Sequence, residues 1–298
     1  MKVKANGIRI EVEDTGADGS QSARPVVLLV MGLGMQLVTW PPGLVQALES
    51  EGFRVVRMDN RDIGLSEYFD HLGVPNLLVG AFRHAIGLPV KAPYSLQDMA
   101  ADTLGVLDAL GIERAHVVGA SMGGMIAQRV ALAAPHRVES LTSIMSSSGA
   151  RHLPGPRMNV LQALLSRPRG LGEAQIVEHY VRFFRMIGSP GFPIDPTLLR
   201  ERMTATIRRA FHPAGTARQM AAIAADTGRA DELPRIANPT LVVHGTDDPL
   251  VPLACGEDTA RRIPGARFAP VKGMGHDLAP GVVDRLLELL VPHLRRTR

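Results

Sequence analysis

The feature that most constrains this chain is the pentapeptide at residues 119–123, which reads GASMG and fits the pattern G-x-S-x-G. The apolar run before it, 115–118, is typical of a buried parallel strand. Residues 124–134 after it have the apolar periodicity of a helix, which Pro135 would end. A serine at such a turn is held in a strained backbone conformation that exposes its hydroxyl, and glycines flank it because strand and helix approach closely. The pattern predicts that Ser121 is a nucleophile; the alternative is a glycine-rich turn with an incidental serine.

Composition limits the class of protein. The length of 298 residues fits one α/β core with an insertion. The single Cys255 excludes a disulfide framework and a cysteine metal cluster, and its neighbours favour a core thiol. Residues 1–15 lack the apolar segment of a signal peptide, and no apolar run reaches the roughly 18 residues that span a bilayer. The net charge of +4 does not indicate a nucleic-acid partner. We therefore expect a cytoplasmic protein with no membrane insertion and no nucleic acid.

Apolar runs alternate with helical patterns along most of the chain, which predicts an α/β fold with a mainly parallel sheet of about eight strands and helices on both faces. A hairpin about Gly7 opens the chain. The predicted strands are 3–6, 8–15, 25–31, 53–58, 115–118, 138–146, 240–244 and 267–271. The predicted helices include 40–49, a helix capped by Ser95 with Asp98 three residues on, 124–134 and 282–294.

Residues 147–235 differ from the rest of the chain in sequence pattern and composition. Their helical patterns are broken by proline and glycine, and they contain thirteen arginines, no lysine and seven acidic residues. We predict a helical cap inserted between two core strands, so that the α/β core comprises 1–146 and 236–298. A solvated helical face would account for most of the arginines; a basic rim that attracts anionic substrates is the alternative.

Two further segments follow the strand 53–58. Residues 59–66, DNRDIGLS, are densely polar, and we favour a hydrogen-bonded turn that buttresses neighbouring loops over a direct functional role. The connection 68–93 is longer than most loops in compact domains, and connections of this length are often lids or binding loops. Its stretch 76–90 is markedly apolar. We expect a lid-like loop that packs over the mouth of the site and lines it; a dimer contact is the competing outcome, which leaves a homodimer open.

Three acid–base groups follow the carboxyl ends of predicted strands: Ser121, an aspartate at 247 or 248, and His276. Open α/β sheets bind ligands at that edge. A serine hydroxyl needs a base within hydrogen-bond reach, and an imidazole with an unperturbed pKa near 6.5 can serve. A buried carboxylate would fix the tautomer of the imidazole. His116 and His244 lie in or at the ends of core strands, where a satisfied core histidine is expected.

The chain contains VMG at 30–32, DNRDIGLS at 59–66, VVGASMGG at 117–124, HGTDDPLVP at 244–252 and GMGH at 273–276. These stretches resemble the α/β-hydrolase superfamily, and the resemblance covers nearly the whole chain. Within it, the pattern is similar to the bacterial esterase and haloperoxidase-like branch, and to its aclacinomycin methylesterase type. This chain differs in having Met31-Gly32 where many relatives have His-Gly, and in the length of the 68–93 connection.

The resemblance implies Ser121 as nucleophile, Asp248 as acid and His276 as base. It implies an oxyanion hole made by the backbone N–H groups of Leu33 and Met122, with no cofactor and no metal. The family spacing puts the acid three residues after the glycine that ends the strand, and the proline after Asp248 biases that residue towards an extended backbone. The neighbouring aspartate at 247 is then expected to cap the turn or face solvent.

The function implied is hydrolysis of a small-molecule carboxylic ester through an acyl-enzyme intermediate. The same triad also serves cofactor-free perhydrolases and haloperoxidases, lactonases, C–C hydrolases and acyltransferases, which remain alternatives. A non-catalytic ligand receptor is a third hypothesis. Epoxide hydrolases and dehalogenases of this fold use an aspartate where this chain has Ser121, so they are disfavoured.

Overall fold

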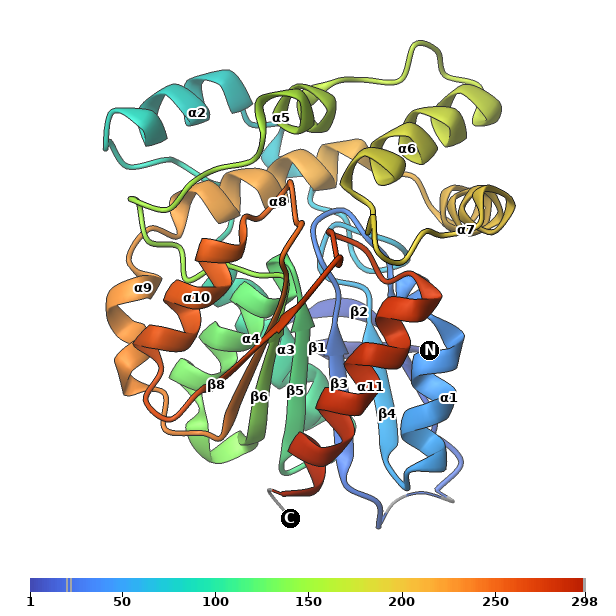
Figure 1. The fold of residues 1–298 in the computed structure, drawn as a ribbon, viewed down its shortest axis with the longest axis vertical. Coiled ribbons are helices and arrows are strands. Elements are labelled where there is room, and N and C mark those ends of the chain that lie inside the picture. The colour runs from blue at the N-terminus through green and yellow to red at the C-terminus, as the bar shows by residue number, and fades with distance from the viewer. Residues whose placement is uncertain (20, 22, 297–298) are drawn as a thin grey trace.

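Eight strands form a single sheet in the computed structural model, which describes residues 1–19, 21 and 23–296 (Figure 1). Their bounds are β1 Lys2–Ala5, β2 Ile8–Asp14, β3 Val26–Val30, β4 Arg54–Met58, β5 Ala115–Ala120, β6 Val138–Ile144, β7 Thr240–Gly245 and β8 Arg267–Val271. The spatial order is β1-β2-β4-β3-β5-β6-β7-β8. Strand β2 is antiparallel to β1 and β4, and all other neighbours are parallel. The predicted α/β class and mainly parallel sheet are confirmed.

Helices cover both faces of the sheet because its central strands are apolar on both sides. In β3, Val27 and Leu29 join a core shared with α1 and α11, whereas Leu28 and Val30 join a second core shared with α3 and α4. Helix α10 packs on β7 and β8. The covering helices are α1 Pro42–Ser50, α3 Leu96–Ala109, α4 Met122–Ala133, α10 Leu253–Arg262 and α11 Pro280–Arg295.

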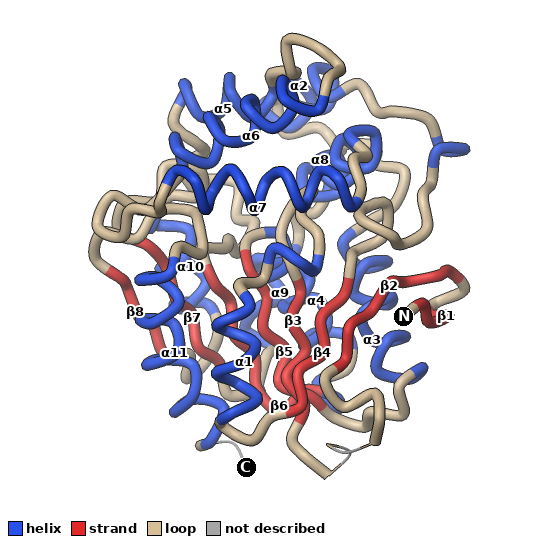
Figure 2. The backbone as a smooth tube through the Cα atoms, turned by 90° about the vertical axis from the view of Figure 1, so that its right-hand side faces the viewer, coloured by secondary structure: helices blue, strands red, loops and turns tan. Residues whose placement is uncertain are grey.

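A second group of helices lies beyond the carboxyl ends of the parallel strands (Figures 1 and 2). Most belong to residues 147–235, called the cap segment below, and every regular element described in that segment is helical. The division into core and cap domains stays a prediction. These helices are α2 Leu77–Ala85 from the 68–93 connection, then α5 Met158–Leu165, α6 Glu173–Ile187, α7 Pro196–Arg209 and α8 Pro213–Ala225 of the cap segment. The last helix of the cap segment, α9 Arg229–Glu232, lies lower, beside α10 (Figure 1).

Four short 3₁₀ turns complete the described elements, and none of the described helices combines the length and apolarity that a membrane crossing requires. The turns are η1 Leu37–Thr39, η2 Asp70–Leu72, η3 Pro135–Arg137 and η4 Leu233–Arg235.

Several local predictions are confirmed. The hairpin turn uses Asn6 and Gly7, with φ of 49° and 83°, the left-handed pair that a two-residue turn requires. Ser95 and Asp98 form a reciprocal capping box at the start of α3.

Several boundaries differ by one or two residues from those predicted. Helix α4 starts at Met122 rather than 124, because helical geometry begins directly after the strained serine, and α11 extends to both sides of the predicted range. Helix α1 starts at Pro42 rather than 40, and β6 ends at Ile144 rather than 146. Helix α2 was not predicted as a helix.

Candidate active site

Ser121 lies on the sharp turn between β5 and α4. Its backbone has φ 56° and ψ −121°, a strained conformation for a residue with a side chain. Its N–H donates to the Ile144 carbonyl at 2.8 Å, which holds the turn to β6. An added Cβ at Gly119 would lie 2.1 Å from the Gly123 carbonyl oxygen, and one at Gly123 would lie 2.0 Å from that of Val30. Both flanking positions therefore require glycine.

The structure brings three predicted site residues into one hydrogen-bonded chain. His276 Nε2 lies 3.0 Å from Ser121 Oγ, and His276 Nδ1 lies 2.6 Å from Asp248 Oδ2. With the Nδ1 proton donated to the carboxylate, Nε2 is the nitrogen that accepts from the serine hydroxyl. The other oxygen of Asp248 accepts from the N–H groups of Leu250 and Val251, at 2.9 and 2.8 Å. Asp248 and His276 are both buried, so this arrangement is shielded from water.

Asp247 points elsewhere. Its Oδ2 accepts hydrogen bonds from the Thr246 hydroxyl at 2.7 Å and from the Gly273 N–H at 3.1 Å. It thus ties the turn after β7 to the start of the loop that carries His276. Of the two adjacent aspartates, Asp248 is the one in contact with the imidazole.

The loop before His276 is fixed from the cap segment. The His276 N–H donates to the carbonyl of Ile187, the last residue of α6, at 2.7 Å. The N–H of Gly191 donates to the Gly273 carbonyl at 2.9 Å, and an added Cβ at Gly275 would lie 2.4 Å from the Gly188 carbonyl oxygen. The turn after α6 and the histidine loop are therefore in close backbone contact.

The two residues predicted to form an oxyanion hole lie on segments that meet at Ser121. Met122 is the first residue of α4, so its N–H has no acceptor within the helix and is available to an anion. The second segment approaches through Gly32, where an added Cβ would lie 3.0 Å from the Ser121 Cβ. Leu33 follows Gly32 directly, so its loop runs against the serine.

Two buried glutamines that the sequence analysis missed link the cap segment to residues 32–36, which we call the oxyanion loop after the role predicted for Leu33. Gln219 of α8 accepts from the Gly34 N–H at 2.9 Å and donates to the Arg61 carbonyl at 2.9 Å. Gln36 donates to the carbonyls of Thr206 and Ala210, at 2.7 and 2.8 Å, at the end of α7. Nothing in the local sequence pattern distinguishes these glutamines from surface ones.

The predicted buttress at 59–66 is confirmed. Asp59 is fully buried, and burial raises the pKa of its carboxyl group. The carboxylate accepts from the N–H groups of Leu37 and Leu65, at 2.7 and 2.9 Å, and from Arg209 at 2.7 Å. It therefore joins the oxyanion loop, its own turn and α7.

Nine of the thirteen arginines in the cap segment are exposed, so the prediction that most of them are solvated is confirmed. Arg218 and Arg229 are the buried exceptions, at 0% and 1% exposed. Arg218 of α8 donates to both carboxylate oxygens of Asp62 in the core, at 2.7 and 2.8 Å, and to Asp70 at 2.9 Å. Arg229 pairs with Asp226 and donates to Gln128 of α4 at 2.8 Å. Helix α8 and the start of α9 are thus anchored to the core by buried charges.

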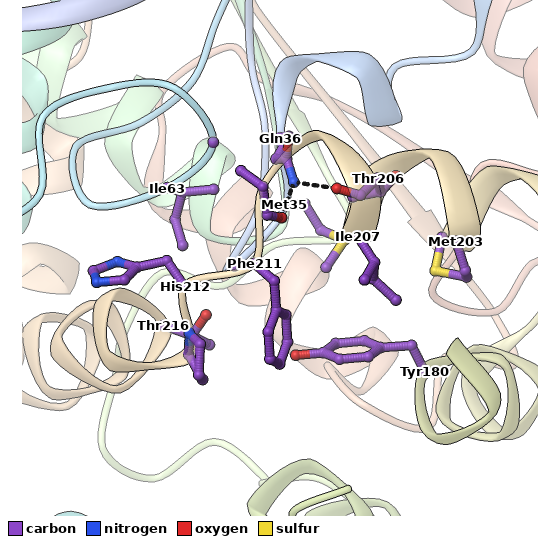
Figure 3. A pocket seen from close by; sticks show the side chains of 14 residues that line it. Met35, Gln36, Ile63, Tyr180, Met203, Thr206, Ile207, Phe211, His212 and Thr216 are labelled. Carbon is purple, nitrogen blue, oxygen red and sulfur yellow. Dashed lines mark hydrogen bonds between the residues drawn. The ribbon is translucent and has the colours of Figure 1, made fainter. Parts of the chain in front are cut away.

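A small pocket lies where the oxyanion loop meets the cap segment (Figure 3). In it, Tyr180 and Phe211 meet edge to face, with ring centroids 6.2 Å apart. Its lining contains no residue of 76–90, the stretch expected to line the site. That expectation has no support from this pocket and stays a prediction. The side chains labelled in Figure 3 are those of Met35, Gln36, Ile63, Tyr180, Met203, Thr206, Ile207, Phe211, His212 and Thr216.

Other candidate groups are structural, as predicted. His116 is buried with Nδ1 2.8 Å from the Ser140 hydroxyl. His244 donates from Nε2 to the Val251 carbonyl at 2.7 Å, and burial lowers its pKa. Cys255 is a buried free thiol, and burial raises its pKa to about 11. A thiol with so high a pKa is unreactive at neutral pH.

The comparisons with known proteins agree with this geometry. The family described as "alpha/beta hydrolase fold" matches residues 25–279. Rhodomycin D methylesterase DauP of Streptomyces sp. (strain C5) is 30% identical over 292 residues, covering 90% of each chain. Rhodomycin D methylesterase DnrP of Streptomyces peucetius is 29% identical over 293 residues, again covering 90% of each chain. The predicted resemblance to this type of methylesterase is confirmed.

Solved structures support the fold alone. A meta-cleavage product hydrolase from Pseudomonas fluorescens IP01 has a TM-score of 0.76 and 21% identity, over 100% of this chain and 98% of that chain. The enol-lactonase from Burkholderia xenovorans LB400 has a TM-score of 0.70 and 23% identity, over 99% of this chain and 100% of that chain. With the methylesterase relatives, these matches lead to one conclusion: the chain belongs to the alpha/beta hydrolase fold family and is an enzyme of the carboxylic ester hydrolase class.

Proposed function

We propose that the chain hydrolyses a carboxylic methyl ester through an acyl-enzyme intermediate on Ser121. The observation that carries this proposal is the hydrogen-bonded chain from Ser121 through His276 to Asp248. The relatives named as methylesterases support methanol as the leaving alcohol.

In the first half-reaction, Ser121 Oγ attacks the ester carbonyl carbon while His276 takes its proton. The N–H groups of Leu33 and Met122 stabilise the negative oxygen of the tetrahedral intermediate. The C–O bond to the alkoxide breaks, and the imidazolium returns the proton so that the alcohol leaves neutral. In the second half-reaction, His276 deprotonates a water molecule, which releases the carboxylic acid and regenerates the serine hydroxyl.

The pocket beside the oxyanion loop is our candidate for the acyl group. Its aromatic pair, Tyr180 and Phe211, and the thioether side chains of Met35 and Met203 favour an apolar or aromatic acyl moiety.

The test compares methyl, ethyl and p-nitrophenyl esters of aromatic acids with matched lactones, with peracid formation and with a C–C cleavage substrate. We expect preferential hydrolysis of the methyl esters, and stoichiometric phosphonofluoridate labelling that maps to Ser121. Ser121→Ala should retain less than about a thousandth of wild-type turnover. Ser166→Ala, at an exposed serine after α5, is the matched control. Unlabelled protein, or a preference for lactone, peracid or C–C chemistry, would contradict the proposal.

A further inference from the structure

The end of the molecule farthest from the C-terminus carries large exposed apolar side chains. In α2, Leu78 and Phe82 are 77% and 65% exposed, and they share one helix face. The opposite side of α2 packs on α8. Beyond α2, Met158 is 67% and Leu171 is 97% exposed. The exposed apolar residues of this region are Leu72, Val74, Leu78, Val79, Phe82, Ile86, Leu88, Met158, Leu165 and Leu171.

These residues belong to two segments, 71–91 and 147–172, that lie together. Helices α2 and α5 are neighbours at the top of the molecule in both views (Figures 1 and 2). The loop between α5 and α6 continues along the top on the other side of α5, as Figure 1 shows. Arg151 donates to the Gly87 carbonyl at 2.9 Å, which links the segments directly. We call them together the basic apolar face.

The charges of the basic apolar face all have one sign. Neither segment contains an aspartate or a glutamate, and together they carry six lysines and arginines. Arg83 and Arg151 donate to the backbone carbonyls of Pro89 and Gly87, bonds that leave their charge uncompensated. The six are Arg83, Lys91, Arg151, Arg157, Arg167 and Arg169.

We propose that the basic apolar face docks on an anionic lipid bilayer, lying on the surface without spanning it. A helix that exposes leucine and phenylalanine among basic residues is the pattern of interfacial membrane binding. Each lysine or arginine close to an anionic surface contributes to that binding, and the apolar side chains enter the headgroup boundary. A large apolar patch left in water is otherwise unusual for a soluble monomer.

The positive charge of the basic apolar face favours an anionic lipid surface, rather than a second copy of this chain, as its partner. A twofold dimer would place the same face on both sides of the contact. Six cations would then oppose six cations with no acidic residue of either segment between them. An anionic lipid surface supplies the missing negative charge.

The experiment is sedimentation of the full chain with sucrose-loaded vesicles. One set contains phosphatidylcholine alone, and the other contains about a third phosphatidylglycerol, enough for a negative surface potential. We expect binding to the anionic vesicles only, and its loss at about 1 M salt, where the Debye length is about 3 Å. Arg167→Glu with Arg169→Glu should lower the partition coefficient by about tenfold or more, and Leu78→Gln with Phe82→Gln should do likewise.

The matched control is Arg267→Glu with Arg285→Glu, the same charge change at exposed positions on β8 and α11. Its binding should stay at the wild-type level, and thermal unfolding should show that all variants are folded. Equal binding to both vesicle types, or an equal loss in the control, would overturn the proposal. So would light scattering that shows a dimer, dissociated by the Leu78 and Phe82 changes, in a protein that binds no vesicles. Because the assay measures binding, its outcome does not depend on the proposed esterase activity.

Discussion

Ser189, in the turn after α6, donates its hydroxyl hydrogen bond to the carboxylate of Asp277, the residue that follows His276. The same hydroxyl accepts from the Gly275 N–H at 2.9 Å, on the other side of the histidine. The Ser189 N–H also donates to Asp277, at 3.3 Å. Ser189 of the cap segment therefore contacts both neighbours of His276, the base in the proposed mechanism, and fixes the loop that carries it.

The first prediction is that Ser189→Ala lowers kcat by about tenfold to a hundredfold, because a small misplacement of a catalytic group costs that much. KM should change little, since Ser189 is not part of the pocket lining. Steady-state kinetics on a methyl ester measures both. Ser189→Thr keeps a hydroxyl and should recover part of the rate, whereas Ser166→Ala should have no effect. A parallel rise in KM and loss of thermal stability, without a change in kcat, would show that the contact is only structural.

The two adjacent aspartates give the second prediction. Asp248→Asn keeps the shape of the acid but removes the charge that orients His276, and this change cost about 10⁴ in kcat in a well-studied serine protease. Asp247→Asn affects only the turn contacts with Thr246 and Gly273. We expect a loss of several orders of magnitude for the first variant and a few-fold change for the second. Turnover of both on one ester decides the assignment, which is reversed if Asp247→Asn is the more damaging.

The third prediction concerns Gln219, whose amide joins the Gly34 N–H to the Arg61 carbonyl. Gln219→Met keeps the side-chain volume but leaves both backbone groups without this partner. We expect kcat/KM to fall by about tenfold, since a buried polar group left unpaired costs about 1–3 kcal/mol. A trifluoromethyl ketone, which forms an oxyanion on the serine, should bind more weakly by a similar factor. Gln46→Met, at an exposed position of α1, is the control, and unchanged inhibitor affinity in Gln219→Met would contradict the prediction.

The fourth prediction follows from Asp70. The hydrogen bond from Arg218, with a further one from His212, lowers the pKa of Asp70 below its ordinary value of 3.8. A carboxyl group whose pKa is lower in the folded state stabilises the fold above the unfolded pKa, and this contribution is lost as the pH falls through the folded pKa. Asp70→Asn should therefore have a lower thermal midpoint of unfolding than the wild type at neutral pH. Below about pH 4 this gap, the difference between the two midpoints, should disappear.

Thermal unfolding followed from neutral pH to acid pH measures that gap. Asp284→Asn, at an exposed position of α11, controls for the loss of one surface carboxylate. A gap between wild type and Asp70→Asn that stays constant through the acid range would mean that the ionised carboxylate does not stabilise the fold.

The core could be predicted from the sequence because its signals are local. Each of Ser121, Asp248 and His276 follows a short apolar strand, and parallel strands bring their carboxyl ends to one edge. The contacts of Gln219, Ser189 and Arg218 could not be predicted in this way. Each depends on how α6 and α8 pack over the core, and that packing joins residues more than 80 positions apart. Periodicity within a window of a dozen residues contains no information about such pairs.

The pairing of Arg218 with Asp62 limits which cap segments can replace the present one in evolution or in the laboratory. A cap transplanted from a relative that lacks this arginine would leave a fully buried carboxylate unpaired, a cost of about 3–5 kcal/mol. That is a large fraction of the stability of a typical domain. The core and the cap segment therefore have to be inherited as a unit. If the pocket holds the acyl group as we propose, single changes at Tyr180 or Phe211 alter substrate preference without breaking this pair, unlike exchange of the whole segment. Laboratory recombination of this chain should place its crossovers so that both partners come from one parent.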